Sequence, residues 1–479
     1  MAVEYGESFF ERALANLAGA WREVAQGAAR TLGRNRHESA DASREALSQQ
    51  MVECLEARGG EVSARLCAAE LGRTYLEMDA AGRRRFLEVL AQDFAVDTEA
   101  LDAAISGYRK DETVAEHIAA TRRLRQASVP PRARLLTQFN ALPEGVKFLV
   151  DLRQDLLQIA EKDPHLSDLD EDLRELLASW FDTGFLDMKR IAWDSPAALL
   201  EKLIAYEAVH EIRSWSDLRN RLESDRRCYA LFHPRMPDEP LAFVEIALTR
   251  GMGGSIQTLL DERAPKADPA GADTAIFYSI SNTQRGLKGI AFGEFLIKMA
   301  VERLASDLPR LKVFATLSPL PGFRRWLDRA EPQTLRRAFT VEEEGGLRAL
   351  GGSDQLELAL SEVLERPDWH RDPVVEQALK GPLLRLAALY LGAKGKGSRP
   401  LDPVMRFHLR NGARLERINW LGDSSPKGLK ESAGLMVNYR YILDDIEKNH
   451  EAYMQQGTVA LGTDARALTK AAKASGARS

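Results

Sequence analysis

Cysteine is scarce in this sequence. The 479 residues include three cysteines, Cys54, Cys67 and Cys228, and no two of them have CxxC spacing. Cysteines this far apart exclude a disulfide framework and a zinc knuckle. Acidic and histidine residues with metal-ligand spacing are also missing from the first half, so we expect no metal. Isolated thiols of this kind fit a protein that works in a reducing cytosol.

Long apolar runs are absent as well. No run approaches the roughly 20 residues needed to cross a bilayer. The first residues carry Glu4, Glu7 and Glu11, which suit neither a signal peptide nor a mitochondrial presequence. The final SGARS does not match a peroxisomal Ser-Lys-Leu ending. We therefore expect a cytoplasmic protein with no membrane partner.

Neither sign of charge dominates. Lys and Arg number 66 and Asp and Glu number 71, which gives a net charge of −5, and 44% of residues are hydrophobic and 29% charged. These ordinary values exclude a disordered chain, a histone-like coat and a collagenous rod. Without a basic and aromatic stripe, a nucleic-acid partner is not expected. At roughly 150 residues per domain, the length allows two or three domains.

Helical periodicity dominates up to about residue 185. The first apolar stripe follows one face of a helix that begins near Ser8, and its members are Phe10, Leu14, Leu17, Trp21 and Val24. Similar stripes continue to Trp180 and are separated by turns that contain Gly and Pro. We predict an all-helical bundle over residues 1–187 and interpret it as an oligomerisation domain.

The pattern changes after Pro196. Short β-branched and aromatic runs bounded by Gly, Pro, Asp and Asn are typical of strands, and they cover residues 228–232, 241–248, 275–281, 312–318 and 415–420. An amphipathic helix is expected from about Ile290 to Asp307. These runs predict a mixed α/β domain over residues 188–460, with a helical insertion at about 330–400 and a flexible tail over 461–479. The expected fold class is α+β with two domains.

A turn with several glycines lies between the strand at 275–281 and the following helix. Gly286, Gly289 and Gly293 would let backbone N–H groups approach a ligand, and the helix start directs positive charge at the turn. This arrangement outlines a pyrophosphate site, although a plain turn explains the glycines equally well. The candidate substrate-binding residues are Gln284, Arg285, Gly286, Lys288, Gly289, Ile290, Ala291, Phe292, Gly293 and Glu294.

The spacing of this turn resembles that of GNAT-type acetyltransferases. That family binds the pyrophosphate of coenzyme A on a Gln/Arg-x-x-Gly-x-Gly/Ala turn. Gly289 and Ala291 match the last two motif positions. Gly286 stands where Gln or Arg is expected. The backbone of the turn can still surround a pyrophosphate, but the first side chain of the motif is missing.

A second GNAT-like feature lies in the segment FHLRNGARLERINW. In that family a tyrosine general acid on a helix precedes a glycine by four residues and then a strand, and here His408 and Gly412 occupy those positions. An imidazole titrates near neutrality, whereas a phenol has a pKa of about 10. His408 could therefore exchange a proton at working pH more easily than a tyrosine.

Ser318 ends the strand predicted in KVFATLSPLPGF. Active groups of α/β sheets gather at the carboxyl ends of strands, where loops open onto a crevice. On sequence alone, a role as a helix or turn cap is slightly favoured for this serine. No GxSxG elbow is present, so a hydrolase nucleophile is not expected.

These segments together resemble the malonyl-CoA decarboxylase family. The resemblance is carried by HPRMPDEPLAFVEIALT, AIFYSISNTQRGLKGI, TLSPLPGF, FHLRNGARLERINWLGD and SAGLMVNYRY, and more weakly by ELLASWFDTGFLDMKRIAWDSP in the helical half. It implies that the Ser of TLSPxPGF and the His of HLxNGA, here Ser318 and His408, are the catalytic pair. It also implies that the turn Lys288–Glu294 binds malonyl-CoA and that the chain forms a homo-oligomer, often a tetramer. The missing targeting signals fit a bacterial, cytoplasmic member.

The implied reaction converts malonyl-CoA to acetyl-CoA and CO₂. The thioester carbonyl accepts the electrons as an enolate, so no cofactor is required beyond the coenzyme A of the substrate. We expect Ser318 to orient the carboxylate or accept a proton, and His408 to protonate the enolate. Asn411 is a candidate oxyanion donor, and Tyr439 a candidate for the carboxylate pocket. The alternatives are an acyl-CoA-dependent N-acetyltransferase and a non-catalytic acyl-CoA-binding protein.

Overall fold

The chain forms two compact units. A computed structural model describes Leu17 and residues 19–21, 43–56, 60–109, 113–290, 293–395 and 399–475. Unit 1 comprises Met1–Asp187, Phe232–Leu241 and Asn282–Phe292, and unit 2 comprises Met188–Leu231, Ala242–Ser281 and Gly293–Ser479. The expected fold class, a helical first half followed by a mixed α/β half, is confirmed.

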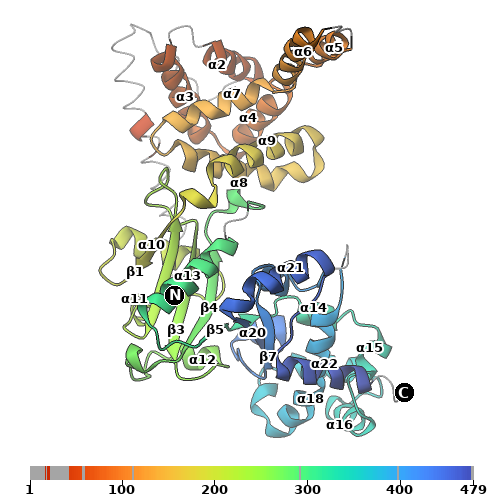
Figure 1. The fold of residues 1–479 in the computed structure, drawn as a ribbon. Coiled ribbons are helices and arrows are strands. Elements are labelled where there is room, and N and C mark those ends of the chain that lie inside the picture. The colour runs from red at the N-terminus through yellow and green to blue at the C-terminus, as the bar shows by residue number, and fades with distance from the viewer. Residues whose placement is uncertain are drawn as a thin grey trace. The chain divides into compact units, whose positions relative to one another are not determined.

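Unit 1 is built from helices that bury aromatic side chains. In Figure 1 its helices run from red to yellow. Trp21 and Phe148 pack edge to face with ring centroids 4.9 Å apart, and the Trp21 indole donates to the carbonyl of Pro143 at 2.8 Å. Of the predicted first stripe, Leu17 and Trp21 are buried, while Phe10, Leu14 and Val24 lie outside the described residues. The helices are α2 Arg44–Glu56, α3 Gly60–Glu77, α4 Ala80–Gln92, α5 Thr98–Tyr108, α6 Val114–Ala127, α7 Pro131–Gln138, α8 Gly145–Ile159 and α9 Pro164–Trp180.

Unit 2 is centred on a mixed sheet. The strand order is β1-β2-β3-β4-β5-β8-β6, and β7 pairs with β8. β4 and β5 run parallel, with Thr274 opposite Val313 and Phe277 opposite Thr316, whereas β8 is antiparallel to β5, β6 and β7. The strands are β1 Asp187–Ile191, β2 Arg226–Phe232, β3 Ala242–Thr249, β4 Thr274–Asn282, β5 Val313–Thr316, β6 Ser318–Pro319, β7 Arg414–Asn419 and β8 Met436–Tyr441.

The strands predicted from the sequence are confirmed as β2, β3, β4, β5 with β6, and β7. β1 and β8 were not among them. β1 has the sequence DMKRI, in which Ile191 alone is buried, so its pattern is that of a charged edge strand. β8 is buried at nearly every position and therefore lacks the alternation that marks a half-exposed strand.

Helices surround the sheet and fill the predicted insertion. Between β6 and β7 the chain is helical, as expected, and α16 approaches α17 so closely that a Cβ on Gly351 would lie 2.5 Å from Cα of Ala359. The helices of unit 2 are α10 Ala197–Tyr206, α11 Trp215–Arg221, α12 Ile256–Leu259, α13 Gly293–Asp307, α14 Phe323–Leu327, α15 Pro332–Arg336, α16 Val341–Gly351, α17 Leu356–Glu365, α18 Pro373–Gly392, α19 Pro403–Arg410, α20 Pro426–Ser432, α21 Ile446–Gln456 and α22 Thr463–Ser475.

The expected flexible tail over 461–479 is wrong for most of its length. Thr463–Ser475 form α22, which packs on α18 and β7. Ala465 is buried at 2% exposure. The preceding chain pairs with β7, because Leu415 N–H donates to the Ala460 carbonyl at 2.9 Å and Gly462 N–H to the Leu415 carbonyl at 2.7 Å. The small residues that resembled a frayed end are the ones that allow close helix packing.

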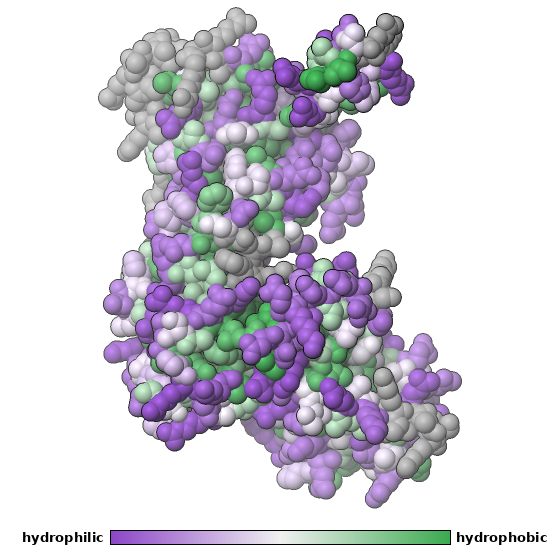
Figure 2. Space-filling model, in the orientation of Figure 1, coloured by the Kyte–Doolittle hydropathy of each residue, from purple (hydrophilic) through white to green (hydrophobic). Residues whose placement is uncertain are grey.

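Hydrophilic side chains predominate on the face of the molecule drawn in Figure 2. None of the helices that the structure describes combines the length and the apolar character needed to cross a bilayer.

The packing of α22 predicts the effect of truncation. A chain that ends at Gly462 should unfold at a lower temperature than the full chain, because it uncovers apolar surface on α18 and β7. A chain that ends at Ser475 keeps α22 and is the matched control. Differential scanning calorimetry measures both, and equal unfolding temperatures for the two truncations would contradict the assignment.

Candidate active site

Ser318 lies where the parallel pairing of β5 ends. Leu317 N–H still donates to the Phe277 carbonyl of β4 at 2.9 Å. Ser318 then begins β6 and pairs with Val437 of β8. The side chain is 6% exposed. The prediction that this serine stands at the carboxyl end of a sheet strand is confirmed.

His408 comes from the last turn of α19. The helix starts at Pro403, and the carboxylate of Asp402 caps it by accepting from Met405 N–H at 2.7 Å. It ends at Arg410, and Gly412 two residues later has a φ of 75° and lies so close to the α21 backbone that a Cβ would be 2.2 Å from the carbonyl oxygen of Ile446. The glycine of the NGA segment therefore allows α19 to stop against α21 and leaves His408 facing inward.

The structure brings Ser318 and His408 together. Oγ of Ser318 lies 3.0 Å from Nε2 of His408, although the residues are 90 positions apart in the sequence. On the other side of the ring, Nδ1 lies 2.8 Å from the hydroxyl of Tyr441. The ring of Tyr439 stacks on the imidazole with centroids 4.5 Å apart. Both ring nitrogens and one ring face of His408 thus have partners.

The hydrogen-bond contacts around His408 indicate which groups donate and which accept. The Ser318 hydroxyl donates to Oγ1 of Thr316 at 2.9 Å. Since a hydroxyl has one hydrogen, Ser318 then accepts from Nε2–H of His408, and Nδ1 accepts from the Tyr441 hydroxyl. Burial raises the pKa of Tyr441, which keeps its phenol protonated and able to donate. We assign the neutral Nε2–H tautomer to His408 on this basis.

Burial also decides the charge of His408. The residue is 2% exposed, and desolvation lowers its pKa from 6.5 to about 3. This result corrects the expectation that the imidazole titrates near neutrality. In the free protein His408 is uncharged at physiological pH and holds one proton, on Nε2.

Buried amides hold the strand ends beneath the pair. Asn438 of β8 donates to the carbonyls of Thr316 at 2.6 Å and Gly253 at 3.0 Å. Its own oxygen accepts from Arg417 Nε at 2.9 Å and from Asn419 at 2.8 Å. Tyr439 N–H donates to Oγ1 of Thr316 at 3.1 Å. The position of Thr316, and with it that of Ser318, is therefore fixed from the side of β8.

Asn411 and Tyr439, which were also predicted as site residues, lie near the pair but make different contacts. Asn411 ends α19, and its Nδ2 donates to the carbonyl of Phe407 at 2.8 Å. Tyr439 is buried against His408. Sequence reasoning missed Thr316 and Tyr441. The signal for Tyr441 was its spacing of two from Tyr439, which places both rings on one face of β8.

The predicted phosphate turn belongs to unit 1 as far as Phe292. Gly286 packs against α8, where a Cβ would lie 1.8 Å from the carbonyl oxygen of Val150. No side chain fits there, which explains why glycine occupies the position of Gln or Arg in the GNAT motif. Buried Gln284 donates to the Pro240 carbonyl at 3.1 Å. Arg285 and Lys288 are exposed.

The rest of the predicted turn is described in part. Gly289 is exposed with a φ of 86°, a conformation that favours glycine. Ile290 N–H already donates to the Leu287 carbonyl at 3.0 Å. Gly293 begins α13. Ala291, Phe292 and the side chain of Glu294 lie outside the described residues.

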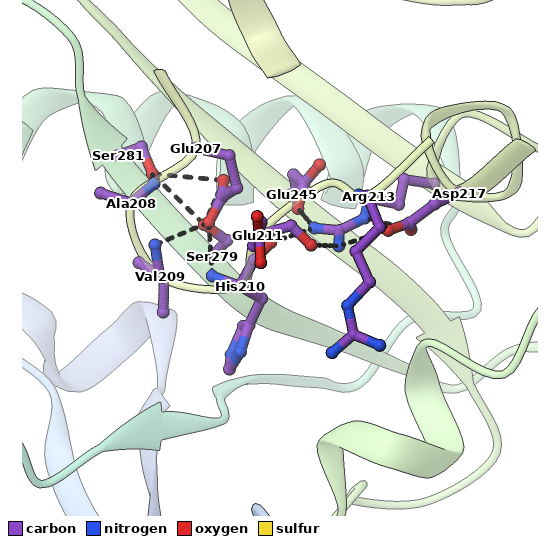
Figure 3. Close-up of polar contacts among 11 residues, drawn as sticks. Glu207, Ala208, Val209, His210, Glu211, Arg213, Asp217, Glu245, Ser279 and Ser281 are labelled. Carbon is purple, nitrogen blue, oxygen red and sulfur yellow. Dashed lines mark hydrogen bonds and ion pairs between the residues drawn. The ribbon is translucent and has the colours of Figure 1, made fainter. Parts of the chain in front are cut away.

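A second polar cluster braces β4 from within unit 2 (Figure 3). The carboxylate of Glu207 accepts from the hydroxyl of Ser279 at 2.8 Å and from that of Ser281 at 3.2 Å. Beside it, Arg221 is paired with Asp217 at 2.8 Å and with Glu245 at 3.0 Å. Burial raises the pKa of Glu245 to about 8 even next to this guanidinium. The cluster ties the loop after α10 to β4, and we assign it a structural role.

Among the residues that the structure describes, no group of three or more His, Cys, Asp or Glu side chains is placed to hold a metal ion. Cys54, Cys67 and Cys228 are buried free thiols.

Comparison with known proteins gives one consistent result. The family profile "Malonyl-CoA decarboxylase C-terminal domain" matches residues 184–478, and "Malonyl-CoA decarboxylase N-terminal domain" matches residues 94–181. The mitochondrial malonyl-CoA decarboxylase of Anser anser anser is 38% identical over 404 residues, which cover 81% of this chain and 80% of the relative. That of Rattus norvegicus is 38% identical over 392 residues, which cover 78% and 79%.

Solved structures agree. The crystal structure of malonyl-CoA decarboxylase from Rhodopseudomonas palustris is 42% identical, has a TM-score of 0.79, and covers 90% of this chain and 100% of its own. That from Agrobacterium vitis is 43% identical with a TM-score of 0.78 and covers 88% and 99%. On the profiles, the sequence identity and the shared fold, the chain belongs to the malonyl-CoA decarboxylase family.

Proposed function

We propose that Ser318 and His408 carry out the decarboxylation of malonyl-CoA in this chain. The observation that supports the proposal most is the 3.0 Å contact between Oγ of Ser318 and Nε2 of His408. The contact joins the TLSPxPGF and HLxNGA segments that the family resemblance singled out. The relatives described above carry the name of this activity.

The reaction needs an electron acceptor and a proton. When the bond between the α-carbon and the carboxylate breaks, its electron pair passes into the thioester carbonyl and gives an enolate, and CO₂ leaves without charge. One proton then adds to the α-carbon and yields acetyl-CoA. The protein has to hold the breaking bond perpendicular to the carbonyl plane, stabilise the enolate oxygen and deliver that proton.

Ser318 orients the malonyl carboxylate in this proposal. Its hydroxyl donates to Thr316 in the free protein and can turn to donate to a carboxylate, because Thr316 is a neutral acceptor and a carboxylate forms the stronger, charge-assisted hydrogen bond. The buried amides around Thr316 keep the serine backbone in place during this change. The role of proton acceptor, which the sequence left open, fits less well because the nearest base, His408, carries its proton on the side of Ser318.

His408 supplies the proton for the enolate. The free imidazole is neutral because burial lowers its pKa to about 3. A malonyl carboxylate bound beside it adds a negative charge, which favours the imidazolium and raises the pKa of the ring. His408 therefore takes up a proton as the substrate binds and gives it to the α-carbon after CO₂ has left. The Tyr441 hydroxyl holds Nδ1 in position throughout.

The other predicted residues keep secondary roles. Asn411 has one amide hydrogen left after its bond to Phe407, and we assign it to the enolate oxygen. Tyr439 forms the wall behind the imidazole. The turn of residues 284–294, of which 284–292 belong to unit 1, binds the pyrophosphate of coenzyme A through its backbone and through exposed Arg285 and Lys288. A homo-oligomer, a tetramer among its forms, and a cytoplasmic location stay predictions.

Substitutions test the catalytic pair. Ser318→Ala and His408→Gln should each lower kcat for malonyl-CoA by about 10²- to 10⁴-fold. Tyr441→Phe, which loses one hydrogen bond to the ring, should lower it by about 3- to 10-fold. Tyr453→Phe removes the hydroxyl of a buried tyrosine on α21 and is the control. Acetyl-CoA and CO₂ are followed in parallel. A wild-type chain that forms neither product refutes the function, and full activity in both Ser318→Ala and His408→Gln refutes the residue assignment.

The buried histidine also predicts a pH dependence of stability. The folded pKa of His408, about 3, lies below the value of about 6.5 for an unfolded chain. Unfolding therefore takes up a proton below pH 6.5, so the stabilisation is complete above that pH and is lost as the pH falls toward 3. Between pH 7 and pH 5 this costs about 2 kcal/mol of unfolding free energy. Urea unfolding of His408→Gln should show a loss smaller by this amount than wild type, and equal losses would show that His408 is not buried neutral.

A further inference from the structure

A buried arginine of the helical unit donates hydrogen bonds to the backbone of the turn that we assign to coenzyme A. Arg153 lies on α8 and is 2% exposed. Its Nη1 donates to the carbonyl of Gly286 at 2.6 Å and to that of Lys288 at 2.9 Å. Its Nε donates to Asp170 of α9 at 2.8 Å. All four residues belong to unit 1.

This contact determines where one peptide N–H points. The described residues contain no cis peptide bond, and in a trans peptide the C=O and the N–H point in opposite directions. Because the Lys288 carbonyl points inward at Arg153, the N–H of Gly289 points outward. Gly289 is exposed, and its N–H has no hydrogen-bond acceptor within the part of the chain that the structure describes.

We propose that Arg153 is a positioning residue for acyl-CoA, and that it orients the peptide between Lys288 and Gly289 so that the Gly289 N–H donates to the pyrophosphate. The inference rests on the proposed function of this turn. Outward N–H groups of a glycine turn are the usual partners of a pyrophosphate. Without Arg153 the peptide can rotate, and the Lys288 carbonyl would then face the anion.

Other contacts already hold the first part of the turn, so the orienting effect of Arg153 falls mainly on the peptide between Lys288 and Gly289. The start of the turn is fixed by Thr283 N–H, which donates to the Leu241 carbonyl at 3.1 Å, and by the contact of Gly286 with the α8 backbone. The N–H groups of Leu287 and Lys288 already donate within the turn. Of the two described peptides whose carbonyls accept from Arg153, the one between Gly286 and Leu287 is also held by its N–H, so the orientation of the one between Lys288 and Gly289 depends more on the guanidinium.

A second buried arginine supplies a matched control. Arg132 of α7 is 1% exposed and donates to Asp172 of α9 at 2.6 Å and to the Ala91 carbonyl at 2.8 Å. It resembles Arg153 in burial and in its pairing with α9, but it donates no hydrogen bond to the described residues of the turn. A merely structural role predicts the same behaviour for substitutions at both arginines.

The test compares two substrates. Malonyl-pantetheine keeps the thioester and the carboxylate of malonyl-CoA but has no pyrophosphate. Arg153→Met should raise KM for malonyl-CoA by about 10- to 100-fold at nearly unchanged kcat, and should change kcat/KM for malonyl-pantetheine far less. Arg153→Lys, which keeps the charge, should restore part of the KM. Arg132→Met should affect the two substrates equally.

The outcomes separate this inference from the function on which it rests. A wild-type chain that converts neither substrate refutes the proposed function. The inference alone is refuted if wild type converts malonyl-CoA but Arg153→Met, like Arg132→Met, changes kcat/KM by the same factor for malonyl-CoA and for malonyl-pantetheine. If Arg153→Met does not fold, Gly289→Ala decides, because its φ of 86° forces the same peptide to move. Gly457→Ala is its control, because Gly457 has a φ of 65° and no neighbouring atom within 4 Å of an added Cβ. If Gly289→Ala lowers kcat/KM equally for both substrates, the proposal is overturned.

Discussion

The imidazole of His408 lies between two hydroxyl groups, with Nε2 3.0 Å from Oγ of Ser318 and Nδ1 2.8 Å from the hydroxyl of Tyr441. Much of unit 2 serves this arrangement. Ser318 follows the parallel pairing of β4 and β5, both tyrosines lie on β8, and His408 lies in the last turn of α19. Burial makes the ring neutral, so its charge state depends on what binds beside it. In our proposal, His408 becomes charged only when an anionic substrate binds beside it.

The net charge of the chain says little about its affinity for an anion. At −5 the protein is acidic overall, whereas coenzyme A esters carry several phosphates. The proposed site meets them with local features: a glycine turn, the exposed cations Arg285 and Lys288, and the buried guanidinium of Arg153 behind the peptide plane. In our proposal, Arg153 also gives the helical unit a part in ligand binding, separate from any role in assembly.

Local pattern predicted the two halves, most strands and the glycine turn. The family resemblance singled out Ser318 and His408, which the structure brings within 3.0 Å of each other. It failed where tertiary packing decides the outcome. α22 is rich in Ala and Lys and resembles a frayed end until α18 and β7 cover it. The pKa of His408 follows from its burial, which no spacing reveals. Arg153 was hidden because a lone arginine on a helix is usually solvated, and its contact lies 133 positions away along the chain. Gly286 departed from the GNAT motif for a steric reason visible only against Val150.

In our proposal, His408 is neutral in the free protein and becomes charged when a malonyl carboxylate binds. Nitrogen NMR of protein labelled with ¹⁵N-histidine measures this directly, with the His408 signals identified by their loss in His408→Gln. The spectra are recorded at pH 6 without ligand and with a CoA thioether that bears a carboxylate and cannot decarboxylate. We expect a neutral Nε2–H imidazole in the free protein and an imidazolium in the complex. An imidazolium in the free protein, or a neutral ring in the complex, would contradict the proposal.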